Sequence, residues 1–252
     1  MLFDLRGKRK RVVQVVYAAL AAIFLVGFVG LGIGVGNGTG GILDAIGLGG
    51  SGGSSGSLSG QFDDQIDAAN EKLAKNPKDT DAILNLAKYE FFKAKQGVTQ
   101  DQSTGQISVS EDAHTELGSS VDAWEKYLRL NKGKPNPSVA AQIVQAYYLL
   151  NDAGGAADAQ EIVATDQPSS GSYGQLAFYR YASFDIPGGD EAAKKAVSMA
   201  PSSTRKTTKQ QLDQIREQAV KSKKQAAKAE KSSTTPGANP LQSPFGGLGA
   251  TP

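Results

Sequence analysis

Few side chains in this sequence stand at the spacings that catalysis requires. Its 252 residues include one histidine and no cysteine, which excludes a site with two imidazoles, thiolate catalysis and cysteine-bound metal clusters. His114 is expected on a solvated helix face, and no serine or aspartate near it has triad spacing. Ser203 and Lys206 satisfy Ser-x-x-Lys, but they stand at the polar start of a terminal helix without a second motif. We therefore predict that the chain is not an enzyme and has no catalytic residue.

A calcium loop is the next candidate, and it fails on its ligands. With Gln100 as the first loop position, Gly105 and Glu111 fall at the sixth and twelfth positions that such a loop needs. The first, third and fifth positions would then be Gln100, Gln102 and Thr104, which lack the carboxylates that a hard cation requires. The glycine-rich segments also lack the context of a phosphate-binding loop. We predict no metal and no cofactor.

The same segment has the pattern of a β-hairpin. Residues 98–100 and 106–109 have strand character and flank the turn-forming stretch Asp101-Gln102-Ser103-Thr104-Gly105. We predict a small β-hairpin insertion at 98–109. It is either an edge that contacts a partner or a tolerated surface loop.

The start of the chain has the pattern of a membrane anchor. The uncharged run from Val12 to Val35 would measure about 36 Å as a helix, enough to cross a hydrocarbon core of about 30 Å with some tilt. Five basic side chains in residues 1–11 precede it, and the positive-inside rule keeps such a stub in the cytoplasm. A cleavable signal peptide is the alternative, although its apolar core is usually only about 7 to 15 residues.

These features predict a topology. Residues 1–11 form a cytoplasmic basic stub, 12–36 form a transmembrane helix and 37–60 form a flexible Gly/Ser linker. The chain is then a single-pass protein of the cytoplasmic membrane with its N-terminus inside and its C-terminal domain extracytoplasmic.

From residue 61 the apolar side chains recur at helical spacing. Prolines follow the candidate second helices, and two successive intervals, Pro135 to Pro168 and Pro168 to Pro201, are both 33 residues. A period of this size is typical of stacked helical hairpins, none of which buries its apolar face alone. The spacing predicts helices at 61–76, 80–96, 110–131, from Pro137, at 155–166, from Ser172, at 190–200 and at 204–230.

Local signals suggest where some of these helices begin and end. Asn136 is predicted as an N-cap before Pro137, a position where the missing N–H of proline costs nothing. Gly97 is a candidate C-cap. Ser172 with Gln175 suits a capping box.

These hairpins resemble the tetratricopeptide repeat (TPR) family, whose unit is a pair of antiparallel helices of about 34 residues. Counting back from Pro168 puts the aromatic position of that pattern at Tyr147, and counting back from Pro201 puts Arg180 there. The resemblance covers 61–203 and implies an all-α, TPR-like helical-hairpin solenoid, preceded here by one transmembrane helix. An ordinary helical bundle is the alternative. The layout is similar to that of the translocon-associated periplasmic TPR proteins of bacteria.

Aromatic side chains gather in two of the predicted first helices. In stacked repeats such helices line the concave side as well as the core, so part of this signal is packing. The rest favours a groove for an extended or helical peptide. We predict Tyr148, Arg180 and Tyr181 as partner-binding residues, with protein partners and no small-molecule substrate.

The charge is distributed unevenly along the chain. Residues 205–231 hold nine basic and three acidic side chains, whereas 37–204 hold 13 basic and 21 acidic ones. The basic helix at 204–230 is expected to be a solvated cap, with electrostatic contact to lipid headgroups as the alternative. Nucleic acid is excluded by the predicted location. Residues 231–252 are expected to be a disordered tail, because their composition cannot bury a core.

Together these features favour a binding module. We expect a membrane-anchored TPR-type protein that holds protein partners at the outer face of the cytoplasmic membrane, such as exported proteins or translocon-associated chaperones. The alternative is a structural or assembly subunit of a cell-envelope complex.

Overall fold

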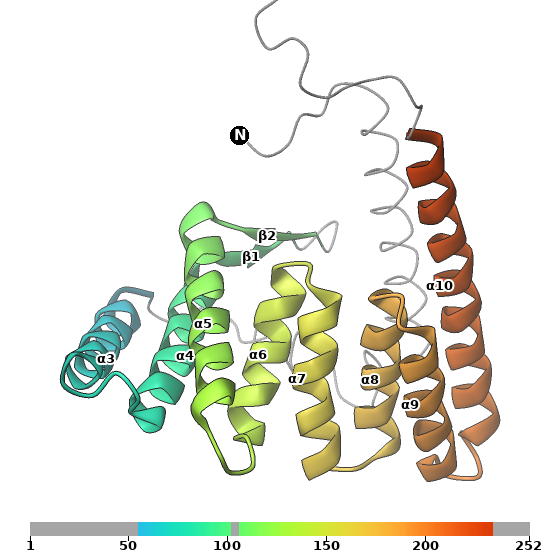
Figure 1. Ribbon diagram of the computed structural model, residues 1–252, viewed down its shortest axis with the longest axis horizontal. Helices are drawn as coiled ribbons and strands as arrows, with labels where there is room; N and C mark the ends of the chain where they lie inside the picture. The colour runs from blue at the N-terminus through green and yellow to red at the C-terminus, as the bar shows by residue number, and fades with distance from the viewer. Residues whose placement is uncertain (1–54, 102–105, 234–252) are drawn as a thin grey trace, which may run out of the picture.

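The computed structural model describes residues 55–101 and 106–233 as an array of helices with one small hairpin of strands (Figure 1). The predicted stub at 1–11, the membrane helix at 12–36, most of the predicted linker and nearly all of the predicted tail lie outside these residues. Within the described ranges, no helix has the length and apolar character needed to cross a membrane. The elements are α3 (Ser55–Lys75), α4 (Thr80–Ala94), the 3-10 helix η1 (Lys95–Gly97), β1 (Val98–Gln100), β2 (Ile107–Val109), α5 (Glu111–Leu130), α6 (Pro137–Leu149), α7 (Ala153–Asp166), α8 (Ser170–Ala182), α9 (Ile186–Met199) and α10 (Arg205–Ser233).

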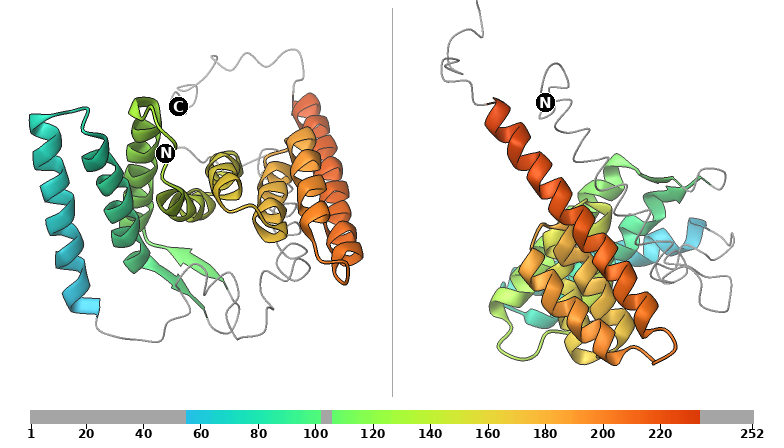
Figure 2. Two further views of the ribbon diagram at one scale, coloured as in Figure 1. Left: turned by 90° about the horizontal axis from the view of Figure 1, so that it is seen from below. Right: turned by 90° about the vertical axis from the view of Figure 1, so that its right-hand side faces the viewer.

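Three helical hairpins follow one another along the array. They are α4/α5, α6/α7 and α8/α9, and each packs on the next. The helix α3 packs on α4 at one end, and α10 packs on α8 and α9 at the other. Both views of Figure 2 show α10 running along the last hairpin, and the right view shows it extending beyond it. The predicted all-α array of helical hairpins with a small β-hairpin is therefore confirmed for the described residues.

The second and third hairpins are repeats of one unit. The helices α6 and α7 begin at residues 137 and 153, and α8 and α9 begin at 170 and 186, each 33 residues later. The two turns match bond for bond: the Asp152 and Asp185 N–H groups donate to the Tyr147 and Arg180 carbonyls, at 2.8 and 2.9 Å. The interval between the prolines is thus the period of the hairpins.

Each of these turns is a Schellman motif, in which a left-handed residue follows the helix. Asn151 (φ 59°) and Phe184 (φ 63°) take this conformation. The aspartate that completes the motif also caps the next helix, because its carboxylate accepts the N–H of Gly155 or Gly188. One residue therefore ends one helix and begins the other.

Several helix ends differ from the prediction. The helix α3 begins at Ser55, inside the predicted linker. The capping box of α8 pairs Ser169 with Ser172, so the predicted pair of Ser172 with Gln175 is wrong. The helix α4 ends at Ala94, and η1 continues to Gly97, so Gly97 is not its C-cap.

The helix α9 begins four residues earlier than the predicted start at residue 190. The segment Pro187-Gly188-Gly189 has the composition of a break, yet α9 already begins at Ile186. Asp185 caps the helix, and Pro187 stands in its first turn, where proline is tolerated. The Asn136 cap before Pro137 is confirmed, since its side chain accepts the N–H groups of Ser138 and Val139.

The β-hairpin projects from the joint between α4 and α5. Its strands are antiparallel, with Val98 opposite Val109 and Gln100 opposite Ile107. Val98 is buried in the core, and Ile107 and Val109 pack against it. The predicted strands are confirmed, and most of the predicted turn, at 102–105, lies outside the described residues.

The core divides into two clusters that meet at α7. Ala156 and Ala159 belong to the cluster formed mainly by α4, α5 and α6. Ala157 and Ala164, on the other side of α7, belong to the cluster formed with α8, α9 and α10. Because alanine side chains are short, α7 can pack closely against its neighbours on both sides. Tyr179 contacts both clusters and links them.

Close packing inside the two repeated hairpins depends on glycine. A Cβ atom added at Gly155 would overlap the ring of Tyr147, and one added at Gly189 would overlap the ring of Tyr181. Both tyrosines stand near the end of a first helix, and both glycines stand in the first turns of the second helix. The absence of a side chain thus lets each tyrosine ring lie against the backbone of its partner helix.

Replacing Gly189 by alanine should destabilise the array. The new methyl group must displace the buried Tyr181 ring, and overpacking of this kind costs about 1–3 kcal/mol. Gly118 is the matched control, because a Cβ there meets nothing within 4 Å and removing a helical glycine gains about 0.5–1 kcal/mol. Thermal unfolding followed by fluorescence of Trp124, the one tryptophan of the chain, measures both. Equal shifts for Gly189→Ala and Gly118→Ala would contradict the close contact.

Candidate partner-binding surface

Tyr148 lies at the joint between α6 and α8. Its half-buried ring lines a small space with Phe178 and Tyr179 of α8. The space measures about 20 Å³, room for about one water molecule and no peptide side chain. Burial raises the pKa of the Tyr148 hydroxyl to about 12. The ring therefore helps to fix α6 against α8 and exposes only part of its surface to a partner.

Arg180 binds three carboxylates of its own chain. Its guanidinium lies 2.6 Å from Glu161 Oε2 and 3.0 Å from Asp158 Oδ1, both on α7, and 3.7 Å from Asp185 Oδ2. The side chain is 22% exposed. Arg180 therefore clamps α8 to the preceding helix, and its charge is already balanced within the chain.

The previous joint has an equivalent contact. The Tyr147 hydroxyl donates to Glu125 Oε1 at 3.2 Å, which links α6 to α5. Tyr147 and Arg180 are 33 residues apart, and so are Glu125 and Asp158. Tyr147 and Arg180, which occupy the aromatic position of the repeat pattern, thus have the same role. Each binds an acidic residue on the second helix of the preceding hairpin.

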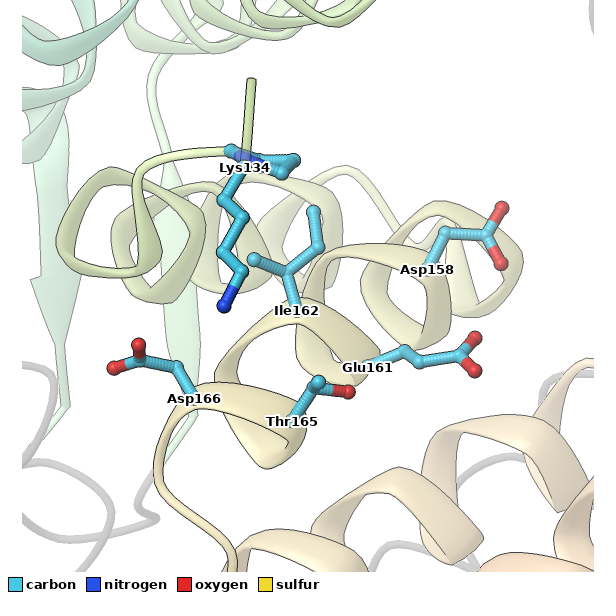
Figure 3. A pocket seen from close by; sticks show the side chains of 7 residues that line it. Lys134, Asp158, Glu161, Ile162, Thr165 and Asp166 are labelled. Carbon is cyan, nitrogen blue, oxygen red and sulfur yellow. The ribbon is translucent and has the colours of Figure 1, made fainter. Parts of the chain in front are cut away.

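An open hollow lies beside this clamp, between α7 and the segment before α6 (Figure 3). Its volume is about 520 Å³, within the range of about 300–1,000 Å³ that ligand pockets occupy. Asp158 and Glu161 stand at one end and Asp166 at the other, with Lys134 reaching in between them. Ile162, Pro135 and Thr165 complete the lining. The hollow thus combines a short apolar floor with charged edges.

Tyr181, the third predicted partner-binding residue, is buried. Its side chain is 1% exposed, because its ring lies under Gly189 of α9. Its hydroxyl donates to Asp190 Oδ1 at 2.8 Å. Burial raises the pKa of this hydroxyl, and the bond to Asp190 adds to the effect. Tyr181 is therefore mainly a packing residue of the third hairpin and exposes almost none of its surface.

Asp190 connects that tyrosine to α10. Its Oδ1 atom also accepts a hydrogen bond from Arg216 Nε at 2.6 Å. The bond from Arg216 holds the pKa of the Asp190 carboxyl below its ordinary value. A chain of three polar groups thus ties α8, α9 and α10 together.

The three predicted site residues do not gather on one surface. Tyr148 lies between α6 and α8, Arg180 between α7 and α8, and Tyr181 under α9. The hollow on α7 was missed, because its acidic residues look in sequence like an ordinary solvated helix face. One sequence signal could have indicated these contacts: Glu125 and Asp158 are separated by the 33-residue period, and so are Tyr147 and Arg180.

The residues with weak catalytic patterns, His114, Ser203 and Lys206, do not form a site. His114 is exposed on α5, and Ser203 and Lys206 are exposed around the start of α10. In the part of the chain that the structure describes, no group of three or more His, Asp or Glu side chains is placed to hold a metal ion.

The fold and these contacts define a class: a TPR-like array of helical hairpins. No family model matches the sequence, and no curated protein matches it. The fold is similar to two crystal structures of MamA. One is 18% identical with a TM-score of 0.37, and the match covers 70% of this chain and 92% of that one. The other is 15% identical with a TM-score of 0.40, covering 85% and 93%. At these TM-scores the likeness is distant, and the class rests on the chain's own repeated hairpins.

Replacing Arg180 by glutamine should loosen the joint between the second and third hairpins. Two carboxylates on α7 would lose a partly buried partner, which we expect to lower the free energy of unfolding by about 1–2 kcal/mol. Arg129 is the matched control: it is 67% exposed and pairs with Glu125 at 3.6 Å, and such surface pairs contribute about 0–1 kcal/mol. Thermal unfolding of Arg180→Gln and Arg129→Gln is the measurement. Indistinguishable midpoints would show that Arg180 is no clamp.

Proposed function

We propose that this chain is a scaffold that binds protein partners and is anchored in the cytoplasmic membrane by residues 12–36, with its helical domain on the outer side. The observation that carries the binding role is the open hollow of about 520 Å³ on α7. It lies on helices that are fixed to their neighbours by Arg180 and by alanine packing. A rigid surface of this kind loses little conformational entropy on binding.

The lining of the hollow supports a peptide as the bound group. Ile162 and Pro135 offer apolar contact, while Lys134, Asp158, Glu161 and Asp166 offer charges of both signs around it. This resembles the arrangement of protein interfaces, in which an apolar centre is surrounded by a polar rim. Arg180 supports this surface by holding Asp158 and Glu161, and Tyr148 helps to fix α6 against α8. No reaction is needed for this role.

The membrane part of the proposal rests on the sequence. The apolar run at 12–36 is long enough to span a bilayer, and the basic stub before it favours a cytoplasmic N-terminus. The segment up to residue 54 then separates the anchor from α3. As partners we propose exported proteins or membrane-bound chaperones that work beside the anchor.

Protease treatment tests the location. In intact cells with a permeable outer layer, or in spheroplasts, added protease should degrade the helical domain and leave a small fragment that contains the anchor. A cytoplasmic protein of similar size serves as the control for lysis. Full protection of the helical domain would contradict the outward orientation, and release of the whole chain in soluble form would contradict the anchor.

Site-specific crosslinking tests the binding role. A photoreactive residue at Thr165, which is exposed and lines the hollow, should form adducts with partner proteins in membranes. The same residue at Ala68, exposed on α3, is the matched control and should form few. Many different adducts support binding of varied clients, whereas one adduct of fixed stoichiometry supports a subunit of a defined complex. Equal labelling from both positions would contradict a partner surface at the hollow.

A further inference from the structure

A second hollow, with the opposite charge character, lies between α9 and α10. Its volume is about 610 Å³. It is lined by four basic side chains, two acidic ones and a short apolar strip: Lys194, Arg205, Lys209, Arg216, Asp190, Asp213, Ala193 and Val197, with Tyr181 and Ser198. The proposed function of the chain does not use this place.

Two of the basic groups have no acidic partner among the described residues. Lys194 is exposed on α9 and forms no ion pair there. The Arg205 guanidinium donates to the carbonyl of Ala200 at 3.0 and 3.3 Å and meets no carboxylate. By contrast, Arg216 is paired with Asp190 and Lys209 with Asp213, each at 2.6 Å. The charge excess of the hollow therefore resides on Lys194 and Arg205.

The shape of the hollow is fixed by contacts that leave these two groups available. Arg216 and Tyr181 hold Asp190 on the α9 side. Leu212 and Ile215 are buried and seat α10 on the last hairpin. The unpaired cations thus stand on two helices whose relative position is already set, so a ligand would not have to bring the two helices together.

We propose that this hollow binds an acidic peptide segment of a protein partner. Glutamate or aspartate side chains would pair with Lys194 and Arg205, and an apolar side chain between them would lie on Ala193 and Val197. A lipid surface fits less well, for two reasons. The hollow is concave and contains Asp190 and Asp213, and the large apolar residues Leu212 and Ile215 of α10 are buried and cannot enter a bilayer.

The test uses the full-length chain in a neutral detergent and a labelled glutamate-rich peptide with two leucines. Lys194→Glu should weaken binding about three- to tenfold. Lys206→Glu is the matched control, because Lys206 is an exposed lysine of α10 outside the hollow and the change in net charge is the same. It should alter the affinity less than about twofold, and binding should weaken as salt is added. A lysine-rich peptide of the same length should bind Lys194→Glu better than the wild type.

Three results would overturn the proposal. Equal weakening by Lys194→Glu and Lys206→Glu would show that only net charge attracts the peptide. No binding by the wild type would remove the site. Binding that depends on Lys194 to phosphatidylcholine vesicles only when they contain phosphatidylglycerol, without peptide binding, would assign the hollow to a lipid surface. None of these results bears on crosslinking at Thr165, so failure here is distinguishable from failure of the proposed function.

Discussion

The turn inside each repeated hairpin is the constraint on which the array depends. Asp152 and Asp185 each complete the Schellman motif of one helix and cap the next, so a single side chain fixes the angle and phase between the two helices. That phase brings the Tyr147 and Tyr181 rings onto Gly155 and Gly189. If the turn were one residue longer, the second helix would rotate by about 100° and present a different face. The 33-residue period is therefore a property of the turn as much as of the helices.

Polar contacts between neighbouring hairpins fix how far each hairpin is shifted along the next. The bond from Tyr147 to Glu125 and the ion pair of Arg180 with Asp158 occupy the same place in successive units. Alanine packing in the core has little directional preference, since short side chains fit at several offsets. A hydrogen bond or ion pair has a preferred geometry, so it selects one offset. The contact between α9 and α10 departs from this pattern, because Asp190 of α9 binds Tyr181 of its own hairpin and Arg216 of α10. This is consistent with α10 being a cap and not a further unit.

The hairpins could be predicted from the sequence because apolar spacing and recurring prolines are local signals. The N-cap at Asn136 and the two short strands were found for the same reason. The start of α9 could not be predicted because proline and glycine in its first turn have the composition of a helix break. The role of Gly189 becomes clear only from the structure, where the Tyr181 ring lies against it. Phe184 gave no hint of its left-handed conformation, since aromatic residues rarely adopt it. The contacts that Tyr148, Arg180 and Tyr181 make within the chain could not be predicted, because tyrosine and arginine serve joints as well as surfaces and sequence spacing does not show which neighbour they meet.

The two hollows differ in charge: the one on α7 is mainly acidic, and the one between α9 and α10 is mainly basic. Residues 55–185 carry 18 acidic and 11 basic side chains, whereas 186–233 carry 5 acidic and 11 basic ones. At physiological salt a charge is felt over only about 8 Å, so the excess at one end has little influence on a partner at the other. In the two proposed roles, each hollow would select a partner by its local charges and its apolar floor. Because the hairpins between them are held by fixed turns and clamps, partners bound at both places would keep a set separation. This geometric property, more than the strength of either contact, is what a scaffold requires.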